Sequence, residues 1–148
     1  GDPKEKIEET LLPISFEAPK GSSISRLRIQ HTGHGSDRPR GCSEFCTRWR
    51  DLYFDGKNVD HRNMWKECST NPLYPQGGTW IYDRAYWCPG DLQLPDAIDL
   101  PAKPDSHNVK MIMEPYTATD NIQAIENISS FLFYYRLKPY VLWKAVKG

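Results

Sequence analysis

Hydrophobic and polar residues alternate along several short segments of the chain. Over residues 24–31, one alternating set is Ser25, Leu27, Ile29 and His31, and the other is Ile24, Arg26, Arg28 and Gln30. Successive side chains of a β-strand point to opposite faces of a sheet, so this pattern predicts a strand with one solvated face. Further segments rich in Ile, Val, Tyr and Phe predict strands over residues 11–17, 48–54, 97–101, 108–115, 127–135 and 140–146.

Turn-forming residues divide the chain into short elements. Its 12 prolines and 10 glycines are scattered, which favours short strands over long helices. Asp55-Gly56 stands between strand-like flanks and predicts a hairpin turn, because both residues tolerate positive φ. Only residues 5–12 carry apolar side chains at helical spacing, and that segment could equally be a linker. The pattern therefore predicts an all-β protein.

Length and charge restrict the class of protein. A chain of 148 residues is most simply one domain, which buries about two thirds of its unfolded surface. We expect residues 1–10 to form an N-terminal arm or linker and residues 11–148 to form that domain. The 19 basic residues balance 19 acidic ones, so no net charge favours nucleic acid or an anionic membrane as a partner. No apolar run approaches the roughly 18 residues of a membrane span, and the first residues lack signal-peptide features.

The cysteines and the central loops indicate the compartment and the functional region. The chain has four cysteines, an even number, although a domain of this size does not need disulfide bonds for stability. This favours export to an oxidising compartment. We therefore expect a secreted, periplasmic or cell-surface protein. Residues 35–95 are rich in breakers and also in Arg, Trp, Tyr and Cys. Loops of this composition on a rigid scaffold usually carry function.

Cys42 and Cys46 enclose Glu44 and Phe45 in a short clamp. If the two cysteines are bonded, their Cα atoms lie about 4.4–6.8 Å apart, whereas four extended steps span roughly 13 Å. The backbone must then bend, which places Glu44 and Phe45 at the tip of the bend in fixed directions. A redox pair and a four-thiolate zinc site are the alternatives. Both usually use C-x-x-C motifs, whereas the other two cysteines are 20 residues apart.

Three blocks of the sequence together form a distinctive set of motifs. They are GHGSDRPRGCSEFC (33–46), ECSTNP (67–72) and DRAYWCPG (83–90). A C-x3-C that encloses a glutamate, then C-S-x-N-P, then D-R-A-x-W-C-P-G, resembles the C-terminal domain of the peptide-N-glycosidase F family. Members of this family are bacterial enzymes that remove Asn-linked glycans. The resemblance runs from near Leu11 to near Tyr135 and covers most of the chain.

The resemblance implies a fold, a cysteine pairing and an activity. The family's domain is an antiparallel jelly-roll β-sandwich that sits beside a second domain of the same kind. Its paired cysteines are disulfides, which implies Cys42–Cys46 and Cys68–Cys88 here. The family hydrolyses the amide bond between N-acetylglucosamine and asparagine in N-glycoproteins. We expect an N-linked glycan or glycopeptide and a second jelly-roll domain as partners, and no cofactor or metal.

The resemblance also implies roles for individual residues. The family's glutamate inside the clamp lies in the active-site cleft between the two domains, which implies a catalytic role for Glu44. It could hold a water or stabilise charge while amide hydrolysis proceeds. The family's equivalents of Arg84 and Trp87 line the glycan-binding cleft, and the histidine of the first block carries over to His34. Arg84 would offer five N–H donors to glycan oxygens or to the peptide carbonyl.

The chain departs from the family pattern in two respects. Thr32 and Phe45 stand where the family's enzyme has tryptophans. A sugar face stacks less well on Phe45, which we still expect to bind substrate, and hardly at all on Thr32. The aspartate on which the family's hydrolysis chiefly depends lies in the N-terminal domain, which this chain lacks. We therefore expect the chain to contribute half of the cleft and to be inactive without a partner domain.

Simpler interpretations of the same residues stay open. Glu44 could pair with a nearby arginine, of which the candidates are Arg38, Arg40 and Arg48. Asp83 and Arg84 could anchor their loop through hydrogen bonds to the backbone. Trp87 could pack against a disulfide, as tryptophans do in many β-sandwiches.

Other function classes also stay open. A non-catalytic glycan or glycoprotein-binding module of a secreted or surface protein is the main alternative, and a structural jelly roll is a third class. Two-domain copper monooxygenases are thought to share this fold, but fold does not carry function. Met111 and Met113 have no paired histidine motif beside them, so we expect no copper site.

Overall fold

A computed structural model describes most of the chain, namely residues 11–34, 37–38, 42–73, 75–101, 103–115, 117–118 and 125–135. The predicted arm over residues 1–10, most of the helix-like segment 5–12 and the strand predicted over residues 140–146 lie outside the described residues. The described part contains no helix that is long and apolar enough to cross a membrane.

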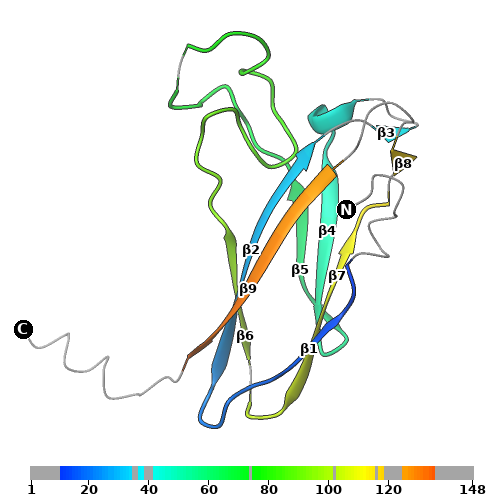
Figure 1. Ribbon diagram of the computed structural model, residues 1–148, viewed down its shortest axis with the longest axis vertical. Helices are drawn as coiled ribbons and strands as arrows, with labels where there is room; N and C mark the ends of the chain where they lie inside the picture. The colour runs from blue at the N-terminus through cyan, green and yellow to red at the C-terminus, as the bar shows by residue number, and fades with distance from the viewer. Residues whose placement is uncertain are drawn as a thin grey trace, which may run out of the picture.

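Two antiparallel sheets face each other (Figure 1). One sheet has the order β1-β7-β4-β5, formed by β1 (Ile14–Glu17), β7 (Ser106–Met113), β4 (Arg48–Phe54) and β5 (Lys57–Met64). The other has the order β6-β2-β9, formed by β6 (Asp96–Pro101), β2 (Ile24–His34) and β9 (Ile125–Tyr135). A short pair joins β3 (Asp37–Arg38) to β8 (Thr117–Ala118). The predicted all-β architecture is confirmed.

The predicted alternation of β2 is also confirmed. Ser25, Leu27, Ile29 and His31 are buried, whereas their neighbours in the strand are partly or fully exposed. The strand runs three residues beyond the predicted end, to His34, because it pairs along its whole length with β9. That extension carries the strand to the loops at one end of the sandwich.

The turn predicted at Asp55-Gly56 joins β4 to β5. Asp55 has a φ of 47° and Gly56 a φ of 77°, the two consecutive positive values that a tight hairpin with the native strand twist requires. Asp55 also accepts hydrogen bonds from the backbone N–H of Asn108 (2.8 Å) and from the His107 ring (2.8 Å). The hairpin is thereby tied to β7 at the end of the sandwich opposite the central loops (Figure 1).

The interior changes character along the strands. Toward the hairpin it is apolar, with a buried cluster formed by Leu27, Ile29, Leu52, Phe54, Leu100 and Val109. Toward the central loops, the same inward face of β4 carries Arg48 and Arg50, which are 7% and 0% exposed. The apolar half supplies the hydrophobic core, and the polar half lies beneath the loops.

Candidate functional site

Three segments meet at the loop end of the sandwich (Figure 1). They are the end of β2, the 3-10 helix η1 (Ser43–Phe45) and the loop around residues 83–90. Ala85 joins them, since its N–H donates to the Glu44 carbonyl (2.8 Å) and its carbonyl accepts from the Gly33 N–H (2.9 Å). Backbone hydrogen bonds therefore fix the clamp, the strand end and the loop relative to one another.

The clamp between Cys42 and Cys46 is closed by a disulfide. The two Cα atoms lie 5.5 Å apart, within the range that such a bond requires. The Phe45 N–H donates to the Cys42 carbonyl (3.0 Å), which completes the bend that the sequence predicts. Glu44 leaves this turn with a side chain that is 24% exposed.

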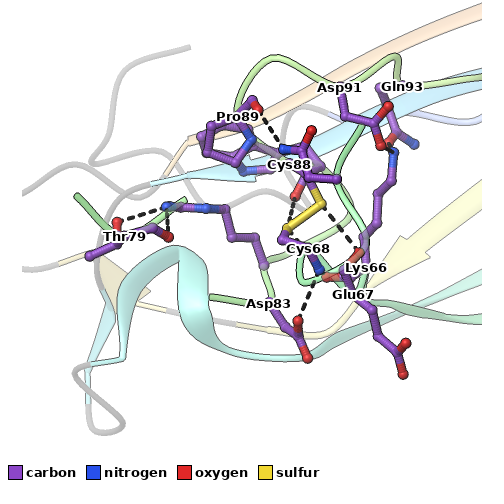
Figure 2. Close-up of a disulfide and its surroundings, with 12 residues drawn as sticks. Lys66, Glu67, Cys68, Thr79, Asp83, Cys88, Pro89, Asp91 and Gln93 are labelled. Atoms are coloured by element: carbon purple, nitrogen blue, oxygen red, sulfur yellow. Dashed lines mark hydrogen bonds and ion pairs between the residues drawn. A yellow bond between two sulfur atoms is a disulfide. The ribbon is translucent and has the colours of Figure 1, made fainter. Parts of the chain in front are cut away.

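The second predicted disulfide, Cys68–Cys88, closes the base of the loop (Figure 2). It is buried, and the Asp83 carboxylate accepts a hydrogen bond from the Cys68 N–H (2.9 Å). Arg84 forms a two-way backbone bridge with Lys66, with N···O distances of 2.9 and 3.1 Å. Because the four cysteines form two disulfides, the four-thiolate zinc interpretation is wrong. In the described part of the chain, no three His, Cys, Asp or Glu side chains are grouped to hold a metal.

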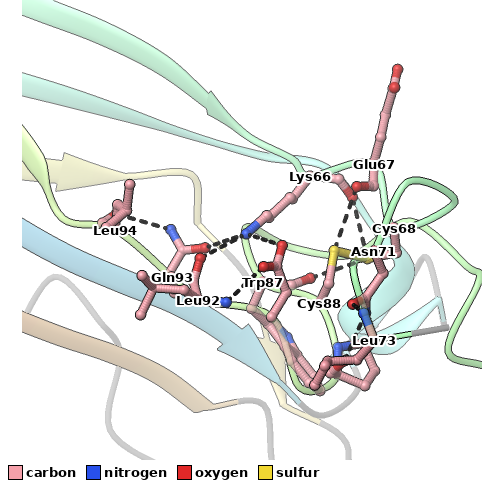
Figure 3. Close-up of polar contacts among 12 residues, drawn as sticks. Lys66, Glu67, Cys68, Asn71, Leu73, Trp87, Cys88, Leu92, Gln93 and Leu94 are labelled. Carbon is pink, nitrogen blue, oxygen red and sulfur yellow. Dashed lines mark hydrogen bonds and ion pairs between the residues drawn. A yellow bond between two sulfur atoms is a disulfide. The ribbon is translucent and has the colours of Figure 1, made fainter. Parts of the chain in front are cut away.

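Polar contacts fix the two sides of the same loop (Figure 3). The Lys66 ammonium lies 3.0 Å from the Asp91 carboxylate and donates to the Leu92 carbonyl (3.1 Å). The Asn71 amide donates to the Pro89 carbonyl (2.7 Å). Gly90 follows with a φ of 77°, and a Cβ there would lie 2.7 Å from a methyl of Leu73. The positive φ therefore favours glycine in the turn after the disulfide.

Arg84 is the centre of the site. Its side chain is only 4% exposed and forms an ion pair with one carboxylate oxygen of Glu44. Its Nη2 donates to the carbonyl and the hydroxyl of Thr79, at 2.7 and 2.8 Å. Its guanidinium carbon lies 4.7 Å from the ring centroid of Phe45 and 4.9 Å from that of Trp87. Arg84 thus holds the Glu44 carboxylate in place from within the protein.

His34 faces the other side of Glu44. Its Nδ1 lies 3.9 Å from the second Glu44 carboxylate oxygen, and its Nε2 lies 3.0 Å from the Thr32 hydroxyl. The rings of His34 and Trp87 are 4.8 Å apart, and the Trp87 indole donates to the Gly33 carbonyl (2.9 Å). The structure therefore brings together all five predicted site residues from three separate segments.

The structure decides between the alternatives for these residues. Glu44 pairs with Arg84, while Arg48 lies 3.6 Å from the Glu114 carboxylate instead. Arg40 and the side chain of Arg38 lie outside the described residues. Asp83 and Arg84 do anchor the loop through backbone groups, as the simpler interpretation proposes, and Arg84 holds Glu44 as well.

Sequence reasoning missed Thr79 and Tyr82. Thr79 accepts two hydrogen bonds from Arg84, and Tyr82 packs edge-on against Phe45 with ring centroids 6.0 Å apart. Both precede the third sequence block, where no motif marks them. Their composition, Thr and Tyr beside Trp80 and Ile81, was the only available signal.

Comparisons with known proteins give a consistent result. A family model described as "Peptide-N-glycosidase F, C terminal" matches residues 3–133. The chain is 33% identical over 107 residues to a peptide-N(4)-(N-acetyl-beta-D-glucosaminyl)asparagine amidase F of Elizabethkingia miricola. The aligned region covers 68% of this chain and 30% of the amidase. PNGase F, a glycosylasparaginase from Flavobacterium meningosepticum, superposes with a TM-score of 0.75 and 26% identity, over 83% of this chain and 43% of that chain.

A more distant structure agrees in fold. PNGF-II superposes with a TM-score of 0.70 and 21% identity, over 86% of this chain and 25% of that chain. Together, these likenesses confirm the predicted jelly-roll β-sandwich. The chain spans 30% of the length of the amidase and 43% of the length of PNGase F. The match is therefore to one part of each of these proteins.

Proposed function

The chain belongs to the peptide-N-glycosidase F family and corresponds to the C-terminal domain of that family. We propose that it forms half of the active site of a glycoamidase. The reaction is hydrolysis of the amide bond between N-acetylglucosamine and the asparagine side chain of an N-glycoprotein. The name of the Elizabethkingia miricola relative describes an asparagine amidase of this substrate class. The partner is a second jelly-roll domain, in the parent protein or in trans.

The position of Glu44 carries this proposal. Its backbone is fixed by the clamp, and one of its carboxylate oxygens is held by the buried Arg84. The other oxygen faces His34 on the partly exposed side of the site, where both side chains are 24% to 33% exposed. A carboxylate held in one direction at a site open to solvent is suited to orient a reacting group.

Glu44 acts on water in this proposal. Amide hydrolysis needs a water directed at the carbonyl carbon, after which the C–N bond breaks and the nitrogen takes up a proton. The Glu44 oxygen that faces His34 holds that water and accepts a proton from it as the water attacks the carbonyl carbon. His34 and Trp87 form the adjacent wall, against which the first sugar lies. The proton donor on the other side of the bond comes from the second domain.

Arg84 contributes mainly through Glu44, since its side chain is almost fully buried. Its Nε has no hydrogen-bond partner among the described residues. The burial of this donor costs free energy, which the contacts of the guanidinium with Glu44, Thr79 and two aromatic rings offset. In this proposal Arg84 therefore acts on the substrate by holding Glu44 in place.

A non-catalytic glycan-binding module is the second candidate. The aromatic rim favours it, because Phe45 is 36% exposed and the adjacent Tyr82 is 58% exposed. Exposed aromatic faces offer a large apolar surface for a sugar ring. The two disulfides support an oxidising compartment in either case, so we propose a secreted, periplasmic or surface location.

The test uses a two-domain protein that joins this chain to the N-terminal domain of the Elizabethkingia miricola relative. We expect it to release glycans from a denatured glycoprotein, and Glu44→Gln to slow release about 100- to 10,000-fold. Glu67→Gln is the matched control, because Glu67 is an exposed glutamate of the same loop region. An unchanged rate for Glu44→Gln would refute its catalytic role. Binding of a chitobiose-containing glycopeptide without cleavage would favour the binding module.

A further inference from the structure

Tyr86 has an unusual backbone in the middle of the site loop. Its φ is 68°, and among the described residues only Asp55, in the hairpin turn, is another non-glycine with positive φ. Side chains other than glycine rarely adopt this conformation, and it persists where surrounding contacts enforce it. The Tyr86 N–H donates to the Arg84 carbonyl (2.7 Å), which closes a tight three-residue turn from Arg84 to Tyr86.

The Tyr86 hydroxyl supplies the enforcing contacts. It donates to the Asp96 carboxylate (2.6 Å) and accepts from the Arg62 guanidinium (2.9 Å). Asp96 begins β6 and Arg62 lies on β5, so the hydroxyl is held by both sheets. Burial, and secondarily the hydrogen bond to Asp96, raise the pKa of Tyr86, so it keeps the proton that it donates.

The groups that hold Tyr86 are themselves fixed. Asp96 is 8% exposed and accepts from Arg50 (3.0 Å), whose side chain is fully buried. Arg62 also forms an ion pair with Asp96. Hydrogen bonds to ionised groups are stronger than those between neutral groups. The hydrogen bonds that anchor the Tyr86 hydroxyl therefore belong to the polar half of the sandwich interior.

Tyr86 lies in the sequence between two residues of the site, Arg84 and Trp87. Arg84 holds Glu44, and Trp87 contacts His34, while Tyr86 reaches instead to Asp96 and Arg62. We infer that Tyr86 is a positioning residue, which ties the loop to both sheets and thereby aims Arg84 and Trp87 at Glu44 and His34. This inference rests on the proposed function for its purpose, but the anchoring itself can be measured without activity.

The experiment compares Tyr86→Phe, Tyr86→Gly and Tyr53→Phe in the full chain. Tyr86→Phe removes only the hydroxyl and leaves Asp96 paired with Arg50 and Arg62, so the sandwich should fold. Tyr86→Gly removes the anchor and also the backbone strain. Tyr53 is a partly buried tyrosine of β4, away from the site, and serves as the control.

Hydrogen exchange by NMR gives the first readout. Loss of a buried hydrogen bond to a charged group should speed exchange of the Ala85 and Gly33 amides, which join the loop to the clamp and to β2, at least about 10-fold. The indole N–H signal of Trp87 should shift or broaden in both Tyr86 variants. Amides of β4 should keep their rates, which separates loop positioning from general destabilisation.

Several results would overturn the inference. Ala85 and Gly33 amides that exchange at wild-type rates in Tyr86→Phe would do so, and so would an equal acceleration in β4 or in Tyr53→Phe. Slower exchange in Tyr86→Gly would show that strain, not anchoring, governs the loop.

Activity is measured separately in the two-domain protein, where Tyr86→Phe should lower kcat/KM about 10-fold and Tyr53→Phe should not. A two-domain protein without activity would refute the proposed function, while the exchange result would still decide the anchoring. A normal kcat/KM for Tyr86→Phe would overturn its positioning role.

Discussion

Arg84 shows how a single buried side chain organises the residues around it. Its donors reach Glu44 and Thr79 in different directions, and its guanidinium lies against two aromatic rings. A buried charge is stable only when it is paired and hydrogen-bonded, so Glu44 and Arg84 depend on each other. The same contacts that stabilise the loop therefore fix the direction of the proposed catalytic carboxylate.

The first prediction concerns replacement of this arginine. Arg84→Lys keeps the charge but loses the planar fork, so one ammonium has to serve both Glu44 and Thr79. We expect glycopeptide binding to weaken by about 1.5–3 kcal/mol, the range for a lost hydrogen bond to a charged group. Isothermal titration with a chitobiose-containing glycopeptide measures the change. Binding at wild-type affinity would mean that the fork is not needed.

At this scale, the sequence predicted which residues gather but not how they pair. The three blocks identified Glu44, Arg84 and His34, because their spacing matches a known family. The candidates for the partner of Glu44 were arginines close in sequence, whereas the actual partner is 40 residues away. That pairing depends on the disulfide and the backbone bridge to Lys66, which bring the loop over the clamp. Local sequence does not encode such contacts.

At the scale of elements, the strands followed from alternation and β-branched content. The segment 48–54 is β4 without change, and the Asp55-Gly56 turn is where the sequence predicts it. The sequence patterns did not predict β5 beyond the strand-like flank of its turn, because the strand is mostly polar and faces solvent along much of its length. The burial of Arg48 and Arg50 on the inward face of β4 could not be predicted either. The acidic partners of such residues lie on other strands, and the pattern of one strand does not show them.

The second prediction tests that buried polar layer through two aspartates of β6. Asp96 is paired with the fully buried Arg50, whereas Asp99 pairs with Arg26 at the surface, where the two side chains are 41% and 48% exposed. Asp96→Ala leaves buried charge uncompensated and should reduce the unfolding free energy by about 3–5 kcal/mol. Asp99→Ala should reduce it by about 0–1 kcal/mol. Urea denaturation measures both, and equal losses would contradict the predicted difference.

The third prediction concerns the pH dependence of the hairpin contact. Hydrogen bonds to Asp55 and to the Lys103 carbonyl raise the pKa of His107 above its usual value. Burial raises the pKa of Asp55, but the hydrogen bonds from Asn108 and His107 outweigh it and lower that pKa overall. The contact thus stabilises the fold most between roughly pH 4 and pH 6.5. Stability is lost as pH rises through the raised pKa of His107, and also as pH falls through the lowered pKa of Asp55.

His107→Gln isolates this effect. The variant also loses ring packing against Phe54, so we expect lower stability at every pH. The informative quantity is the slope, because wild type should lose stability between pH 6.5 and 8 and the variant should lose less. Urea denaturation across this range provides the slopes. Parallel curves for the two proteins would show that the His107 contact does not titrate with folding.

At the scale of the whole molecule, the two disulfides leave no cysteine free in the native protein. The fourth prediction is that the native chain contains no free thiol, since all four cysteines are paired. Intact mass after alkylation should be unchanged without reduction and should rise by four alkyl groups after it. The pair Cys68–Cys88 encloses the longer loop and should contribute about 3 kcal/mol of stability. Alkylation of native protein at all four cysteines, with one bound zinc, would contradict the pairing.

The division of the site between domains leads to the last prediction. The described residues place one carboxylate, Glu44, beside His34, and the family resemblance assigns the principal aspartate to a second domain. Amide hydrolysis needs groups on both sides of the scissile bond, and loss of a key group typically lowers the rate by several orders of magnitude. We therefore expect the 148-residue chain alone to release no detectable glycan from a denatured glycoprotein. Supplying a matching N-terminal domain in trans should restore release. Robust release by the chain alone would mean that the missing acid lies within it, with Asp37 and Asp83 as the first residues to replace.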